Sequence, residues 1–199
     1  GVAGVRRVRN PVLVARRVLE ATDCVLLAGE GATRLAREQG FTDHDPVTAR
    51  ARAQWEAASL SHALGTVGAV ALDDCGRLAA ATSTGGRSMK RPGRVGDAPI
   101  PGAGNYATAH AAVSATGFGE LMLRTVTAKA IADRMARGES AQSAATAVLE
   151  EMSARFGRPI GVICLDAQGR IGVVHGTEAM PHAFRSSAMA AVTARFGLR

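Results

Sequence analysis

The chain has 199 residues, 47% of them hydrophobic, which is enough for one domain with a well-buried core. Its formal net charge is +7, but the arginines are dispersed and only one Tyr and one Trp are available to stack on bases. The charge therefore does not indicate a nucleic-acid partner. No apolar run is long enough to cross a membrane and no signal peptide is recognisable, so we expect a soluble, cytoplasmic protein with no membrane partner.

The three cysteines, Cys24, Cys75 and Cys164, are widely separated and have no CxxC spacing. This argues against a disulfide framework or a zinc site, and we expect each to be a buried, reduced thiol. The histidines show no spacing typical of metal ligands either, which favours surface or hydrogen-bonded roles. They are His44, His62, His110, His175 and His182. We expect no metal site.

The first predicted helix begins at Asn10-Pro11, with Asn as the N-cap and Pro in the first helical position. It ends near Thr22. The spacing predicts one apolar face, formed by Val12, Ala15, Val18 and Leu19.

A buried strand is predicted over residues 24–29 ("CVLLAG"), followed by a helix over residues 30–40 that Gly40 closes. Asp45 is the expected N-cap of a third helix over residues 47–60. Residues 61–64 then form a short linker.

The pattern changes at residue 65 to two apolar runs around an Asp/Gly turn, which predicts a β-hairpin over residues 65–86. Residues 85–104 are rich in Gly and Pro and predict a long loop, a feature that is usually functional inside a compact domain. Further strand is expected over residues 105–117. Two amphipathic helices (118–138 and 140–157) and a second hairpin (160–175) follow. This order indicates an α+β protein built in layers.

Hydroxyl side chains stand at both ends of the first hairpin, at Thr66 on one strand and at Thr82, Ser83 and Thr84 on the other. A threonine at a strand edge is ordinarily explained by β-propensity alone. The residues by themselves therefore leave the role of these hydroxyls open.

Three long motifs occur in one order: "GTVGAVALDDCGRLAAATSTGG", "RPGRVGDAPIPGAGNYA" and "SATGFGE". Together with the upstream segment "GVAGVRRVRNPVLVARRVLEATDCVLLAGEGA", they resemble the plant-type L-asparaginase and isoaspartyl peptidase family of N-terminal nucleophile hydrolases. The resemblance covers most of the chain.

The resemblance implies a single domain, residues 1–199, that cuts itself between Gly65 and Thr66 into an α segment (1–65) and a β segment (66–199). Thr66 then becomes the nucleophile, because its newly freed amino group can act as the base that a threonine hydroxyl needs. Thr84 matches the second threonine that the family places against the nucleophile. The implied substrates are L-asparagine and β-aspartyl dipeptides.

The remaining site residues are also implied by the resemblance. Arg94 matches the arginine that binds the substrate α-carboxylate, and Asp97 the acid that pairs with its α-ammonium. Thr116 and Gly117 match the oxyanion hole. Considered locally, Arg94 and Asp97 could equally be a surface ion pair, and Thr116-Gly117 a strand end.

The implied fold is a four-layer αββα sandwich whose αβ units pair as a homodimer. Family precursors begin with a further segment, holding strands, a supporting asparagine and a sodium-binding loop, that has no counterpart in this sequence. We therefore expect no cofactor. Either the sequence is part of a longer protein, or the protein is short and has lost those strands, which would leave sheet edges unpaired.

Two function classes remain open at this stage. The first is an active amidohydrolase, and the second is a maturation-deficient relative that acts as a scaffold. Within the first class, glycosylasparaginase is less favoured, because those relatives carry Asp before the nucleophile and here Gly65 stands there. Phe118 stands where relatives generally have a smaller or polar residue, which changes the expected shape of the site.

Overall fold

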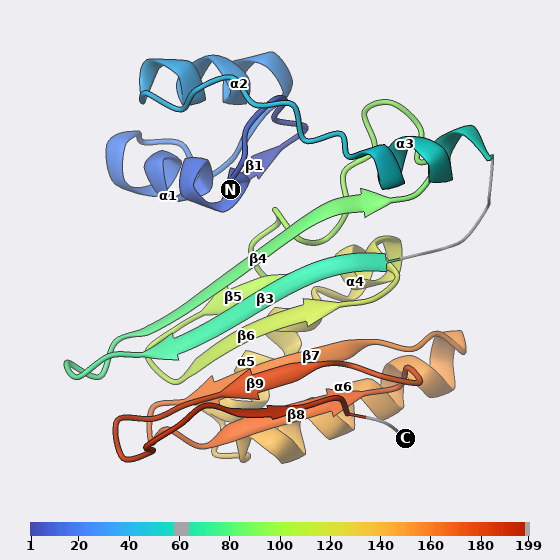
Figure 1. The fold of residues 1–199 in the computed structure, drawn as a ribbon. Coiled ribbons are helices and arrows are strands. Elements are labelled where there is room, and N and C mark those ends of the chain that lie inside the picture. Colours follow the sequence, from blue (N-terminus) through green and yellow to red (C-terminus); the bar gives the residue numbers. More distant parts are fainter. Residues whose placement is uncertain (58–63, 198–199) are drawn as a thin grey trace.

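A computed structural model describes residues 1–57 and 64–197. Its largest sheet is a four-stranded antiparallel sheet in the order β5-β6-β7-β8, to which the predicted strand 105–117 and the second hairpin both contribute (Figure 1). The strands are β5 (Asn105–Ala107), β6 (Ala111–Thr116), β7 (Gly161–Asp166) and β8 (Ile171–His175).

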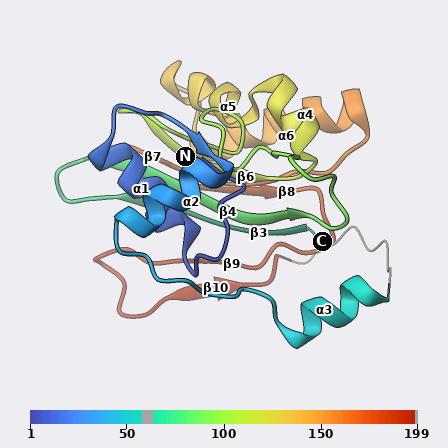
Figure 2. The same ribbon diagram turned by 90° about the horizontal axis from the view of Figure 1, so that it is seen from above.

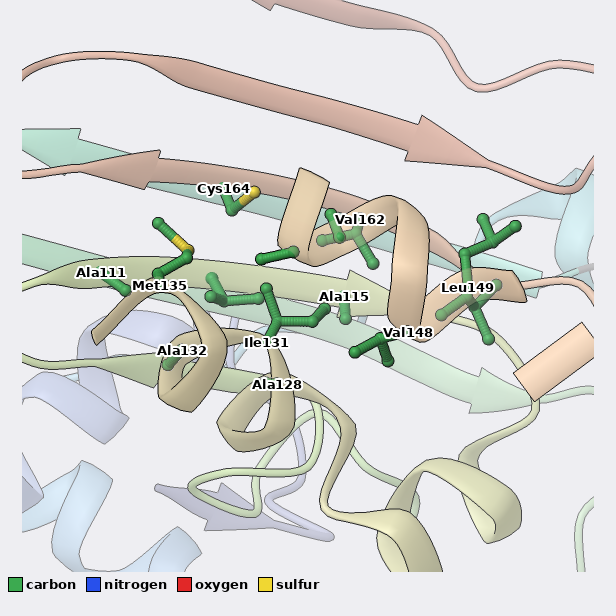
Figure 3. Close-up of a cluster of buried hydrophobic side chains, with 14 of the residues drawn as sticks. Ala111, Ala115, Ala128, Ile131, Ala132, Met135, Val148, Leu149, Val162 and Cys164 are labelled. Atoms are coloured by element: carbon green, nitrogen blue, oxygen red, sulfur yellow. The ribbon is translucent and has the colours of Figure 1, made fainter. Parts of the chain in front are cut away.

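Three helices cover one face of this sheet: α4 (Gly119–Thr125), α5 (Thr127–Ala136) and α6 (Ala141–Phe156) (Figure 2). Side chains of α5 and α6 meet alternate residues of β6 and β7 in the main core, which Figure 3 shows at close range. Ile131 at its centre is completely buried, which contributes about 1.5–3 kcal/mol. Cys164 also lies in this core.

The prediction of a single helix over residues 118–138 is wrong, because the helix is interrupted at Val126, whose backbone is left-handed with a φ of 49°. The second piece, α5, begins where it does because its first amides find partners outside the helix. Ala128 N donates to Ala103 O at 3.1 Å and Lys129 N to Gly102 O at 2.8 Å. The long loop before β5 therefore caps this helix.

The opposite face of the sheet carries the predicted first hairpin, formed by β3 (Leu64–Leu72) and β4 (Leu78–Arg87). Its turn is held by Asp73, whose carboxylate accepts from the amides of Cys75 and Arg77 at 3.0 and 2.8 Å. Asp is favoured in turns because its carboxylate can accept hydrogen bonds from backbone amides in this way. The hairpin prediction is confirmed.

The N-terminal part begins with β1 (Val2–Ala3), α1 (Pro11–Ala21) and β2 (Leu27–Ala28). Strands β1 and β2 pair in parallel, and α1 lies against β4. The structure corrects the predicted strand 24–29, of which only the two residues of β2 are strand. Pro11 opens α1 as predicted, but the Asn10 side chain makes no capping hydrogen bond.

The buried face of α1 also differs from the prediction. Val18 is fully buried as predicted, but so is Val14, which lay outside the predicted face, whereas Val12 is 36% and Leu19 is 80% exposed. Val14 packs with Val8 and Ala36 in a small second core.

The next two helices are α2 (Gly29–Glu38) and α3 (Ala49–Glu56). Thr48, rather than the predicted Asp45, caps α3, because its hydroxyl accepts from Ala51 N at 3.1 Å. The Asp45 carboxylate instead accepts a hydrogen bond from Val47 N, in the loop before the helix. The predicted third helix is too long at both ends, since residues 47, 48 and 57 are not helical. Its residues 58–60 and residues 61–63 of the predicted linker lie outside the described residues, and Leu64 already belongs to β3.

The expectation of three buried thiols is correct only for Cys164. Cys24 and Cys75 are exposed, and they lie in the connecting segments between α1 and β2 and between β3 and β4. The pKa of Cys164 rises to about 12, because burial penalises the thiolate.

The chain ends in a small antiparallel pair, β9 (His182–Phe184) and β10 (Thr193–Arg195). The described elements therefore stack as helices, a four-stranded sheet and the β3–β4 hairpin (Figure 2), with α1 beside the β4 edge of the hairpin (Figure 1). This confirms the α+β class, while the complete four-layer sandwich stays a prediction. Within the described ranges, no helix is both long and apolar enough to span a bilayer.

Candidate active site

The hairpin places Thr66 directly opposite Thr84. They are Cα partners in the β3–β4 register, and Thr66 Oγ1 donates to Thr84 Oγ1 at 3.4 Å. The register shifts between Leu64 and Thr66, so that the regular pairing of the two strands begins at this pair. The structure thus brings together the two threonines that the sequence singled out.

Thr84 also contacts the peptide that precedes Thr66. Its hydroxyl donates to the carbonyl oxygen of Gly65 at 2.8 Å, and it accepts from Gly86 N at 3.0 Å. Since a hydroxyl has one proton, the Thr84 proton points to the carbonyl oxygen of Gly65 in the uncut chain. The carbonyl is therefore polarised by a donor at the predicted cleavage site.

Arg94 is not an isolated surface residue. Its side chain is 17% exposed, and its Nε and Nη2 atoms donate to the two carboxylate oxygens of Glu120 at 3.1 and 3.2 Å. The Arg94 guanidinium lowers the pKa of Glu120 below its ordinary value. Glu120 thus fixes the direction of the guanidinium and leaves Nη1 outside this ion pair.

Asp97 is buried, with 8% of its surface exposed, and burial raises the pKa of its carboxyl above the ordinary value of 3.8. Gly119 brings backbone close to both charged groups. A Cβ there would lie 2.7 Å from Asp97 Oδ1 and 2.8 Å from Arg94 Nη2. The surface-pair alternative for these two residues is wrong, since Arg94 pairs with Glu120 and Asp97 is buried.

Thr116 and Gly117 follow at the end of β6, where Thr116 pairs with Gly161 of β7. Along β6, Ala111, Val113 and Ala115 point into the helix-side core. Alternate side chains of a strand point to opposite faces, so Thr116 points toward the hairpin. It therefore faces the same space between the layers as Thr66 and Thr84.

Phe118 lies between two cations that the sequence analysis did not single out. The guanidinium carbons of Arg87 and Arg158 lie 5.2 and 5.3 Å from its ring centroid, which is cation–π geometry. Arg87 Nη1 also approaches Glu120 Oε2 at 3.8 Å. Phe118 is thus held in place next to the predicted oxyanion residues.

No group of three or more His, Cys, Asp or Glu side chains with metal-binding geometry occurs within residues 1–57 and 64–197. A cavity of about 530 Å³ lies between β8 and the β9–β10 pair, lined in part by His175, His182 and Arg195. A smaller one of about 240 Å³ is lined in part by His110 and Asp166. None of the predicted site residues lines either cavity.

The layered α+β fold thus sets two threonine hydroxyls in contact at the start of a hairpin, a candidate catalytic pair. The chain belongs to the asparaginase family, because the family model described as asparaginase matches residues 1–194. Membership of this family makes it a hydrolase, as the names of its relatives also indicate.

Three relatives illustrate the similarity. The chain is 40% identical over 210 residues to a plant-type L-asparaginase of Pyrococcus abyssi, which covers 94% of this chain and 68% of the relative. It is 44% identical over 205 residues to an isoaspartyl peptidase of Salmonella typhimurium (92% and 65%). It is 41% identical over 180 residues to an isoaspartyl peptidase/L-asparaginase of Xenopus laevis (84% and 58%).

Proposed function

We propose that the chain is a self-processing amidohydrolase that cleaves the side-chain amide of L-asparagine and of β-aspartyl dipeptides with Thr66 as an N-terminal nucleophile. The observation that carries this proposal is the contact between three groups in the uncut hairpin. Thr66 donates to Thr84, and Thr84 donates to the Gly65 carbonyl.

Maturation begins when the Thr66 hydroxyl adds to the Gly65 carbonyl carbon, which the Thr84 hydroxyl polarises from 2.8 Å. The C–N bond of the Gly65–Thr66 peptide breaks, and the hydroxyl proton moves to the departing Thr66 nitrogen. Gly65 is then held to Thr66 by an ester, which water hydrolyses to a Gly65 carboxylate and a free hydroxyl. The freed α-amino group has a pKa near 8 and can serve as a base.

Departure of the Gly65 carbonyl also changes the role of Thr84. Its proton no longer has that acceptor and can turn toward Thr66 Oγ1, which lies 3.4 Å away in the uncut chain. During hydrolysis the Thr66 amine takes the hydroxyl proton, and Oγ1 attacks the side-chain amide carbon. The same proton then goes to the departing ammonia or amino acid. Water hydrolyses the remaining acyl ester and releases aspartate.

Charge that develops on the attacked carbonyl oxygen needs donors on the other side of the substrate. Thr116 has a hydroxyl that faces the hairpin, and the Gly117 amide follows it in the chain. Loss of one oxyanion donor typically costs about 10²–10³-fold in rate. We therefore assign Thr116 and Gly117 to this role.

The charged groups near the site favour a substrate with an amino-acid head. Arg94, held by Glu120, can bind an α-carboxylate, and the neighbouring Asp97 can accept an α-ammonium once it is ionised. Gly119 lies against both, so that any side chain at this position would collide with them. This pair of opposite charges selects an aspartyl head and leaves the leaving group free to be ammonia or an amino acid.

After the cut, segments 1–65 and 66–199 stay together as one αβ unit, supported by the contact between α1 and β4. We also propose that two such units pair as a homodimer. Light scattering of the cleaved protein tests this assembly, and a mass of one αβ unit at micromolar concentration would contradict it.

The test of the function compares wild type, Thr66→Ala and Ser83→Ala for ammonia release from L-asparagine and amino-acid release from a β-aspartyl dipeptide. Ser83 is a matched control, because it lies on β4 beside this pair but alternates to the other face. We expect activity in wild type and Ser83→Ala, and none in Thr66→Ala. A folded wild type that hydrolyses neither substrate, and stays uncut, would favour the scaffold alternative instead.

A further inference from the structure

Thr82 is a hydroxyl of the first hairpin that the proposed reaction does not use. It lies two residues before Thr84 on β4, so both side chains point to the same face, toward β6. On β6, Ser114 lies two residues before Thr116 and shares its face. Thr84 and Thr116 therefore each have a second hydroxyl residue, Thr82 and Ser114, two positions away on the same strand face between the hairpin and the sheet.

These two neighbours are in direct contact. Thr82 Oγ1 lies 2.6 Å from Ser114 Oγ, and Thr82 Oγ1 donates to the Gly104 carbonyl at 3.1 Å. Because Thr82 has one proton, which Gly104 accepts, Ser114 is the donor in the hydroxyl pair. Ser114 is only 4% exposed, so this contact is shielded from water and costly to break.

Gly104 joins the same cluster to the part of the site that holds the substrate head. Its carbonyl also accepts from Ala115 N at 2.8 Å, and its amide donates to Asp97 O at 3.1 Å. A Cβ on Gly104 would lie 2.7 Å from Asp97 Oδ2. Gly104 thus connects the strand of Thr84 and the strand of Thr116 through its carbonyl, and the loop of Asp97 through its amide.

Gly68 completes the contact from β3. It is the Cα partner of Thr82 and lies two residues after Thr66, on the same face. A Cβ at this position would collide with Ser114 Oγ. Because Gly68 has no side chain, the backbone of β3 packs directly against Ser114. This contact determines the distance between Thr66 and β6.

We propose that Thr82, Ser114 and Gly104, with Gly68 above them, form a positioning cluster that holds the nucleophile at the correct distance from the oxyanion donors. The inference rests on the proposed function. These residues do not touch the reacting atoms, and they act by fixing three separate segments to one another. A displacement of about 1 Å at a reacting centre can cost about 10²-fold in rate.

The test uses Thr82→Val, which keeps the shape and removes the hydroxyl, and Thr82→Ser, which restores the hydroxyl. Ser83→Ala is the matched control, because its side chain points away from β6. For each variant we would measure the rate of self-cleavage, kcat and KM per mole of cleaved chain, and the melting temperature.

We expect Thr82→Val to slow self-cleavage and lower kcat at least tenfold while the protein stays folded, and Thr82→Ser to stay within about threefold of wild type. A Thr82→Val variant with wild-type kcat and cleavage rate, or equal losses in the Val and Ser variants, would overturn the inference. An inactive and uncut wild type would overturn the proposed function, and this inference with it.

Discussion

Replacement of Glu120 by Gln tests whether substrate binding depends on how Arg94 is held. Glu120 accepts from Arg94 Nε and Nη2 at 3.1 and 3.2 Å, and Gln keeps the shape of the side chain but loses its charge and one acceptor. Arg94 is 17% exposed and Glu120 is 40% exposed, so the ion pair is partly screened by water.

The size of the effect follows from this partial exposure. A hydrogen bond to a charged group is worth about 1.5–3 kcal/mol when shielded, and an exposed ion pair about 0.2–1 kcal/mol. The pair lies between these limits and Gln retains one acceptor, so we expect a loss of about 1 kcal/mol in binding. That corresponds to a rise of about fivefold in KM for L-asparagine, since 1.4 kcal/mol is tenfold. We expect kcat to stay within about twofold.

Steady-state kinetics on L-asparagine would measure this change. Glu139→Gln is the matched control, because Glu139 accepts from Arg134 Nε at the same 3.1 Å distance on another part of the surface. We expect the KM of that variant to be unchanged. An unchanged KM in Glu120→Gln, or a fall in kcat alone, would refute the idea that Glu120 positions the carboxylate-binding arginine.

Four further predictions concern Thr84, Asp97 and the cysteines. Thr84→Val removes the donor on the scissile carbonyl, so self-cleavage followed by denaturing electrophoresis should slow at least tenfold, and a wild-type rate would contradict this. Because the pKa of Asp97 is raised above 3.8 and only its ionised form binds an ammonium, KM for L-asparagine should fall as pH rises through that pKa, and Asp97→Asn should abolish this limb. The raised pKa of Asp97 also makes folding stability depend on pH, in the opposite direction to substrate binding. Protonated Asp97 favours the folded state, and this stabilisation is lost as pH rises through the raised pKa. The melting temperature measured as a function of pH would show this loss. A thiol reagent should modify Cys24 and Cys75 in the native protein and Cys164 only after unfolding, so three fast thiols would contradict the structure.

Local sequence signals predicted the hairpin well, because its turn depends on residues close together in the chain. The Asp73 carboxylate binds amides two and four residues later, which is a local interaction that the Asp/Gly pattern encodes. The opposition of Thr66 and Thr84 then follows from the register. Their chemical role came from the resemblance to a family, since a threonine on a strand is not informative by itself.

Features that depend on distant partners were missed. The break at Val126 has no Gly or Pro to signal it, and it is set by carbonyls of residues 102–103 that accept from α5. On α1, Val18 was predicted correctly, but Val14, Val12 and Leu19 are all apolar, so only tertiary packing decides which of them is buried. Glu120 stood inside the motif "SATGFGE", but its pairing with Arg94 spans 26 residues and has no local signature.

The central claim, that Thr66 becomes an N-terminal nucleophile, is tested most directly by the intact mass of the purified full-length protein after prolonged incubation under native conditions. The spectrum, recorded after denaturation, should show a break between Gly65 and Thr66, with the second chain beginning "TVGAV". Thr66→Ala, incubated in parallel, should stay uncut. A wild-type chain that remains whole while folded, or an alanine variant that is cut at the same place, would contradict the account.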